Sequence, residues 1–332
     1  MLDNEMKIKG KQIQFRLWLL HHVRNIEHTI FPASSPSNEY FMRHLPNTVS
    51  AQNIIVQGLT KKKDFLLLRF GLYEYQLCFQ FLEKENGLRS SYSQDLLYHL
   101  PLDTGLFGPT TETYDRYARK IISSLDGVDV LSYWRNIPSY FLFSPFYGPK
   151  VAHINVEDLY PYPFWHSKVL PTWQGWLRGK RVLVVSSFAD TIKKQYAHRK
   201  EIWPIETILP EFTLIPYQAV QTNGGRDTKN FLSWEDALHD MVDNISQQNF
   251  DLALISCGGY GMPLAIELHA MGKRAIQWGG CSQLWFGIMG GRWNQDANIM
   301  RYFNPSWTYP SEDETPPLSN LVSGCSYWNP QK

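Results

Sequence analysis

The sequence predicts an α/β protein with a doubly wound, mostly parallel, Rossmann-like sheet and helices on both of its faces. Two observations carry this prediction. Short apolar segments bounded by turn residues recur along the chain, and in the second half they alternate with helical segments. Such alternation is typical of parallel sheets whose crossover connections are helices. The 332 residues, of which 43% are hydrophobic, suffice for one large core or for two domains.

Seven apolar segments have the composition of strands. Segment 64–71 ends in a glycine, and segments 180–187 and 251–256 run from a charged lead-in through aliphatic residues to a polar end. Runs of this length between turn residues are typical of buried parallel strands. Pro216 cannot donate a ladder hydrogen bond, so its segment is expected at an edge of the sheet. The predicted strands are 64–71, 128–134, 151–155, 180–187, 212–220, 251–256 and 274–278.

Capping residues bound several predicted helices. Ser233 is followed by acidic residues at 235 and 236, which is the pattern of an N-cap and a first helical turn. Gly272 provides a C-terminal stop for the helix before it. The predicted helices are 11–30, 73–86, 112–125, 190–201, 234–247 and 262–271.

Composition divides the chain into three parts. Residues 1–60 are predicted to form an N-terminal helical extension, and residues 61–295 an α/β domain. A break between sub-domains is placed near 136–178, where proline and aromatic residues are frequent. Residues 296–332 are rich in proline, asparagine and serine, and we expect an irregular C-terminal tail.

Charge and cysteine content narrow the classes of partner. The formal net charge is +1 and the basic residues are scattered, so no nucleic-acid partner is expected. The four cysteines lie far apart without metal-ligand spacing, as is typical of reduced thiols. The polar start of the sequence lacks the pattern of a signal peptide, and the apolar stretch 15–20 is too short to cross a bilayer. We expect a cytoplasmic protein with at most peripheral association at the inner face of the membrane.

Turns at the ends of three predicted strands form the candidate ligand site, because open parallel sheets bind ligands beyond the carboxyl ends of their strands. The turns lie at 186–187, 256–261 and 279–282, and the last two are rich in glycine. Glycine lets the backbone approach a ligand, and free N–H groups at a helix start can bind a diphosphate. A tight strand-to-helix connection without a ligand would explain the same glycines. The candidate residues are Ser186, Gly258, Gly259, Tyr260, Gly261, Gly279, Gly280, Ser282 and Gln283.

Two further segments carry charged candidates. In 69–74 (RFGLYE), Arg69 could bind phosphate in a bidentate manner, and Glu74 could bind a divalent cation or act as a base. A structural ion pair between these two side chains is an equal alternative. In 283–293, Arg292 could lie near phosphate while the tryptophans stack on a base or sugar. Packing of the apolar residues in the core is the alternative there.

Together, eight segments resemble a bacterial family of capsule and surface-polysaccharide biosynthesis proteins that is related to the GT-D-type glycosyltransferases. The resemblance covers about residues 60–295, and 279–293 is its most specific part. The segments are 180–187, 195–199, 208–212, 218–221, 257–264, 271–275, 279–288 and 291–293.

The resemblance implies a metal site at 69–74. GT-D-type enzymes carry an Arg-Phe-Gly-Asp-Gly-Glu-like element whose Asp-x-Glu helps to hold a divalent metal and the nucleotide sugar. Arg69, Gly71 and Glu74 match this element, whereas Leu72 stands at the aspartate position. A Mn²⁺ or Mg²⁺ cofactor would then be held by Glu74 together with another acid or the sugar diphosphate, and metal-independent chemistry is the alternative.

The function implied by this resemblance is a glycosyltransferase that moves a sugar from a nucleotide-sugar donor to a glycan or lipid-linked glycan acceptor in bacterial surface-polysaccharide biosynthesis. Residues 61–295 would form the catalytic domain, and Glu74 would be the catalytic residue. Two alternatives remain, a transferase of a non-sugar group onto polysaccharide and a non-catalytic protein that binds nucleotide sugars or assists assembly. The sequence also leaves self-association into a homo-oligomer open.

Overall fold

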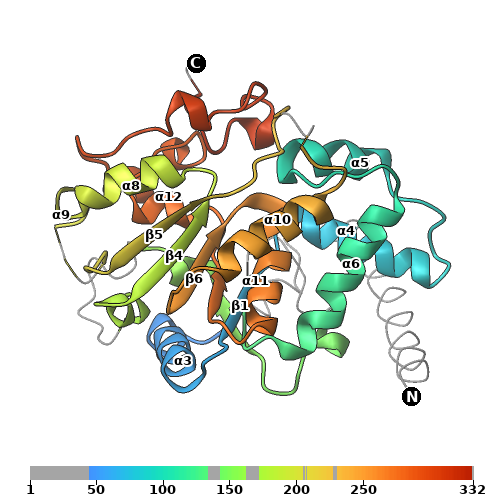
Figure 1. Ribbon diagram of the computed structural model, residues 1–332, viewed down its shortest axis with the longest axis horizontal. Helices are drawn as coiled ribbons and strands as arrows, with labels where there is room; N and C mark the ends of the chain where they lie inside the picture. The colour runs from blue at the N-terminus through green and yellow to red at the C-terminus, as the bar shows by residue number, and fades with distance from the viewer. Residues whose placement is uncertain are drawn as a thin grey trace, which may run out of the picture.

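One parallel sheet organises the molecule (Figure 1). In a computed structural model, the described residues are 45–133, 143–161, 172–204, 206, 208–226 and 230–330. Seven strands lie in the order β3-β2-β1-β7-β6-β4-β5, and every pairing is parallel. This arrangement confirms the predicted doubly wound, Rossmann-like α/β fold. The helix predicted at 11–30 lies outside the described residues.

All seven predicted strands are present, each trimmed at its ends. The strands are β1 (Leu66–Arg69), β2 (Val130–Tyr133), β3 (Ala152–Asn155), β4 (Arg181–Ser186), β5 (Thr213–Gln218), β6 (Leu252–Ser256) and β7 (Ala275–Gln277). The β4 and β6 strands are buried on both faces, which explains their uninterrupted aliphatic sequences. The prediction that Pro216 marks an edge strand is also confirmed, because β5 pairs only with β4.

The predicted helices within the described residues are confirmed, with one difference. The helices are α3 (Thr48–Lys61), α4 (Leu72–Glu85), α5 (Gln94–His99), α6 (Glu112–Ser124), α8 (Ala189–Ala197), α9 (Arg199–Ile202), α10 (Trp234–Ser246), α11 (Gly261–Ala270), α12 (Cys281–Trp285) and α13 (Ala297–Met300). The single helix predicted at 190–201 is two helices, α8 and α9, separated at His198. Ser233 caps α10 by accepting a hydrogen bond from the backbone N–H of Asp236, as expected.

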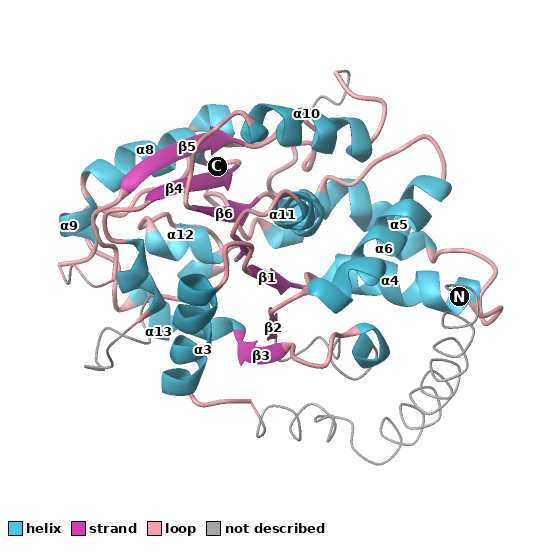
Figure 2. Ribbon diagram, turned by 60° about the horizontal axis from the view of Figure 1, so that its bottom comes forward, coloured by secondary structure: helices cyan, strands magenta, loops and turns pink. Residues whose placement is uncertain are grey.

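Helices cover both faces of the sheet (Figure 2). Alternate residues of β1 point to opposite faces, so Leu66 and Leu68 enter one core and Leu67 enters the other. The first core is covered by α4, α6, α10 and α11, and the second by α3, α8 and α12. The described helices therefore cover both faces, and the edge at the carboxyl ends of the strands is where a ligand is expected to bind.

Residues 296–330 pack against the second core although most of them are irregular. Trp307, Val322 and Trp328 are buried there. In Figure 1 this segment, coloured red, runs over the top of the sheet. It is therefore an integral wall of the molecule at the edge where the strands end. None of the described helices is long and apolar enough to cross a membrane.

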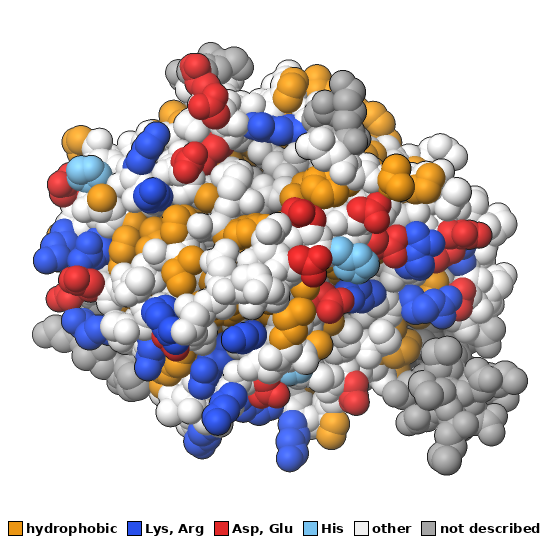
Figure 3. Space-filling model, in the orientation of Figure 1, with side chains coloured by type: hydrophobic (Ala, Val, Ile, Leu, Met, Phe, Trp, Pro, Cys, Tyr) orange, Lys and Arg blue, Asp and Glu red, His pale blue; other side chains and the backbone are white. Residues whose placement is uncertain are grey.

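The opposite edge of the sheet is basic. Lys61 to Lys63 precede β1, Lys180 and Arg181 begin β4, and Arg274 precedes β7. Lysines and arginines accordingly gather along the lower part of the face shown in Figure 3. Several of them are neutralised, since Lys62 pairs with Asp129 and Arg181 pairs with Asp251.

Candidate functional site

A cleft of about 410 Å³ lies at the carboxyl edge of the sheet. Because all strands are parallel, the ends of β1, β4, β6 and β7 meet there, joined by the segment that follows β5. The turn at 103–104 and the C-terminal residues Ser323, Tyr327 and Trp328 complete the lining. The cleft thus lies where the topology of the sheet predicts a ligand site.

Arg69 and Glu74 both line this cleft. Arg69 ends β1, and Gly71 is the N-cap of α4, whose first turn contains Glu74. The Glu74 carboxylate folds back over Gly71, so any Cβ at position 71 would overlap it. Burial raises the pKa of Glu74, while the backbone and the Arg69 guanidinium oppose that shift. The cleft therefore contains a carboxyl group with increased proton affinity next to a fixed cation.

The turn after β7 lies between two guanidinium groups. Gly279 has a φ of +56°, and a Cβ there would overlap the guanidinium of Arg69. A Cβ at Gly280 would lie 3.1 Å from Nη1 of Arg292. Arg292 donates a hydrogen bond of 3.2 Å to the hydroxyl of Tyr327 and lies 4.7 Å from the centre of its ring. Two arginines fixed on either side of a glycine turn form an arrangement suited to a phosphate-bearing ligand.

The turn after β6 contributes less of its surface to the cleft. Gly258 lines the cleft and has a φ of +56°, but a Cβ there would lie 2.9 Å from the carbonyl oxygen of Thr104. Gly259 faces Leu106, and Gly261 faces the side chain of Gln277. Close packing against other side chains therefore explains the glycines at positions 259 and 261 without a ligand.

Four other predicted residues lie in the interior. The Ser186 hydroxyl accepts a hydrogen bond from the backbone N–H of Phe188, and Ser282 shares one of 2.8 Å with Ser256. The Tyr260 hydroxyl lies 2.7 Å from that of Thr222. Gln283 donates to the carbonyl of Tyr327 and accepts from the indole N–H of Trp293. These four residues are buried beneath the lining of the cleft and hold it in place through their hydrogen bonds.

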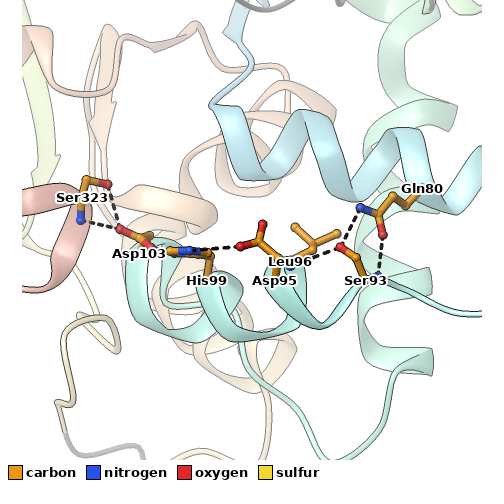
Figure 4. Close-up of polar contacts among 7 residues, drawn as sticks. All are labelled: Gln80, Ser93, Asp95, Leu96, His99, Asp103 and Ser323. Atoms are coloured by element: carbon orange, nitrogen blue, oxygen red, sulfur yellow. Dashed lines mark hydrogen bonds and ion pairs between the residues drawn. The ribbon is translucent and has the colours of Figure 1, made fainter. Parts of the chain in front are cut away.

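Asp103, which lines the cleft, holds the C-terminal wall in place (Figure 4). Its Oδ1 accepts hydrogen bonds from the backbone N–H of Ser323 (2.6 Å) and from its hydroxyl (2.8 Å). Its Oδ2 lies 2.6 Å from Nδ1 of His99, and the other ring nitrogen of His99 lies 3.6 Å from Asp95. The ring of His99 also stacks on Tyr73, another lining residue, with centres 4.7 Å apart.

The donor groups for a metal ion are few. Among the residues that the structure describes, no three His, Cys, Asp or Glu side chains gather to hold one. Glu74 and Asp103 are the carboxylates that line the cleft, and both oxygens of Asp103 already accept hydrogen bonds or contact an imidazole. Among the described lining residues, Glu74 is therefore the side chain that would hold a divalent ion, together with oxygens of the ligand.

The cysteines near the cleft are buried thiols. Cys257 and Cys281 follow β6 and β7, and burial raises the pKa of both, that of Cys281 to about 12. Because the thiolate is the reactive form, neither side chain has the character of a nucleophile at neutral pH.

The fold and the cleft together define a doubly wound α/β protein with a cleft at its carboxyl edge that is lined by two arginines. Comparison with known proteins adds no closer assignment, since no family model, curated protein or solved structure matches the chain.

Replacing Glu74 with glutamine is expected to stabilise the protein increasingly as the pH rises. Because the pKa of Glu74 is raised in the folded state, the unfolded chain loses this proton first, and the wild type loses stability as pH increases through the raised pKa. Glutamine stays neutral. The difference in Tm between E74Q and wild type should therefore be small below pH 4.5 and grow as the pH rises above that ordinary value. The exposed Glu85→Gln change is the control, and a pH-independent difference for E74Q would contradict the expectation.

Proposed function

We propose that this protein is a glycosyltransferase that uses a nucleotide-sugar donor in bacterial surface-polysaccharide biosynthesis. The observation that carries the proposal is the pair Arg69 and Arg292, which flank the Gly279–Gly280 turn in one cleft with Glu74. A donor diphosphate bears negative charge that such guanidinium groups match. The resemblance of 69–74 and 279–293 to the GT-D-type enzymes supports the same function.

The reaction would be a displacement at the anomeric carbon. A hydroxyl oxygen of the acceptor forms the new bond to that carbon while the bond to the diphosphate oxygen breaks, and the nucleoside diphosphate leaves with the electron pair. Arg69 and Arg292 would stabilise the charge that develops on the leaving group. Glu74 would accept the hydroxyl proton, because burial increases its basicity once it is ionised.

One observation favours a non-catalytic role in binding nucleotide sugars. Leu72, at the position of the aspartate in the GT-D-type element, lines the cleft with 48% of its surface exposed. A leucine side chain supplies no oxygen to a metal or to a sugar hydroxyl. Such a protein would bind the donor through the two arginines without turning it over.

Ligand-dependent stabilisation would test the proposal. The Tm of the full chain would be measured with UDP, GDP, CDP, ADP and dTDP and with their sugar conjugates, with and without Mn²⁺, because a ligand that binds the folded state raises Tm. We expect stabilisation by one nucleoside diphosphate and slow hydrolysis of its sugar conjugate. Stabilisation without turnover, even with glycan acceptors, would favour the binding protein. The proposal fails if no nucleotide changes Tm.

A further inference from the structure

The polar side chains that line the cleft, apart from Arg69, Tyr73, Glu74 and Arg292, fall into two groups. Those of the first group are engaged by the protein itself. Asp103 accepts hydrogen bonds from Ser323, Thr104 donates one of 2.6 Å to the carbonyl of Leu100, and Ser256 donates one of 2.6 Å to the carbonyl of Gly279. These groups shape the walls, and their hydrogen-bonding capacity is largely used.

The second group consists of Ser187, Gln221 and Asn223. Ser187 follows β4, and the other two follow β5. All three are half-buried, and none of their side chains makes a hydrogen bond to another described residue. An amide offers two donors and an acceptor, and a hydroxyl offers one donor and acceptor sites. Three neutral side chains with free capacity thus face the space of the cleft.

The backbone holds the two amides in place. Thr222, between them, donates a hydrogen bond of 2.6 Å to the carbonyl of Gly105 and contacts the Tyr260 hydroxyl. The N–H of Gly224 donates one of 3.0 Å to the carbonyl of Leu102. Thr222 therefore points into the protein while its neighbours in sequence line the cleft. Because the backbone is already held, a ligand would have to order only the two amide side chains and not the loop that carries them.

Charge distinguishes this side of the cleft from the other. The cations among the described lining residues are Arg69 and Arg292, and both lie at the turn after β7. The loop that carries Asn223 is instead hydrogen-bonded to the turn that carries Asp103, through Gly224 and Leu102. A second negative group on the ligand would therefore lie near the Asp103 carboxylate, and the described lining residues offer it no additional cation.

We infer that Ser187, Gln221 and Asn223 form a subsite for the uncharged, hydroxylated sugar of the donor, and that this subsite selects neutral sugars over uronic acids. Sugar hydroxyls are both donors and acceptors, which neutral amides and hydroxyls match without the desolvation of a charge. The inference rests on the proposed function and adds to it the class of sugar and the residues that recognise it.

Calorimetric titration of the full chain can test this subsite. The affinity for whichever nucleoside diphosphate binds would be compared with that for its conjugates with glucose, N-acetylglucosamine, mannose and glucuronate. For the wild type we expect at least one neutral sugar to increase affinity and glucuronate not to do so. In Q221A/N223A the gain from the neutral sugar should fall about 30-fold, since two hydrogen bonds are lost and together they contribute about 2 kcal/mol. Affinity for the diphosphate alone should be unchanged.

A control variant with two amides removed elsewhere shows whether the loss of affinity is specific to the cleft. Asn244→Ala with Gln247→Ala removes the same two amide types from α10 and its C-cap, outside the cleft. Q221A alone is a milder variant should the double variant fold poorly. If the wild type binds no nucleoside diphosphate, the proposed function itself fails. If it binds one, three results would overturn the subsite: no gain from any neutral sugar, glucuronate binding as tightly as the neutral sugars, or an equal loss of diphosphate affinity in Q221A/N223A.

Discussion

The variant R69Q is expected to bind nucleoside diphosphate about 10- to 100-fold more weakly than the wild type. Arg69 is fixed at the end of β1 against Gly279, so it would meet the diphosphate without rearrangement. Hydrogen bonds to charged groups contribute about 1.5–3 kcal/mol, and each 1.4 kcal/mol corresponds to about a tenfold change in Kd. Calorimetric titration with the diphosphate that stabilises the wild type measures this change.

Two variants separate charge from fold in this test. R69K keeps the positive charge but loses the bidentate geometry, so its affinity should fall between those of wild type and R69Q. Arg116→Gln removes an arginine that pairs with Glu235 on the surface, and its affinity should match the wild type. An R69Q protein with normal Tm and unchanged affinity would show that Arg69 does not contact the diphosphate.

The variant G279A is expected to lose both stability and diphosphate binding. A non-glycine residue with a φ near +56° costs about 1–2 kcal/mol in backbone conformation. The new methyl group would also displace the guanidinium of Arg69, so the affinity for diphosphate should fall about as far as in R69Q. Chemical denaturation gives the free energy of unfolding, and calorimetry gives the affinity.

Gly272 provides the matched control. It also has a positive φ, of +72°, but a Cβ there would meet nothing within 4 Å. G272A should therefore lose stability through backbone conformation alone and should bind diphosphate like the wild type. Equal affinities in G279A and G272A would contradict the role assigned to the Arg69–Gly279 contact.

The sequence was sufficient to predict the sheet and the edge that carries the cleft, because strands and their terminal turns are local patterns. The apolar run before Gly71 and the one before Gly279 are far apart in the chain. They nevertheless become neighbours as β1 and β7, and their turns meet at the carboxyl edge. Arg69 and Glu74 line the cleft for the same reason, since both are adjacent to the end of β1.

The sequence could not show which side of a turn faces the cleft, because distant residues decide it. Gly259 and Tyr260 lie in a glycine-rich turn, yet Leu106 and Thr222 occupy the space beside them. Their partners come from the loops after α5 and β5, and no periodic pattern relates these segments to β6. Ser323, in a segment expected to be irregular, likewise reaches the cleft only through tertiary packing.

The wall formed by residues 322–328 links the cleft to the order in which the protein is synthesised. Strand β7 joins the half-sheet β3-β2-β1 to the half-sheet β6-β4-β5, so the sheet is continuous only after residue 277 has left the ribosome. A nascent chain that has reached α13 contains every strand but still lacks Ser323 and Tyr327. Its cleft is open on one side. The lining of the cleft is thus completed at a later stage of translation than the sheet itself.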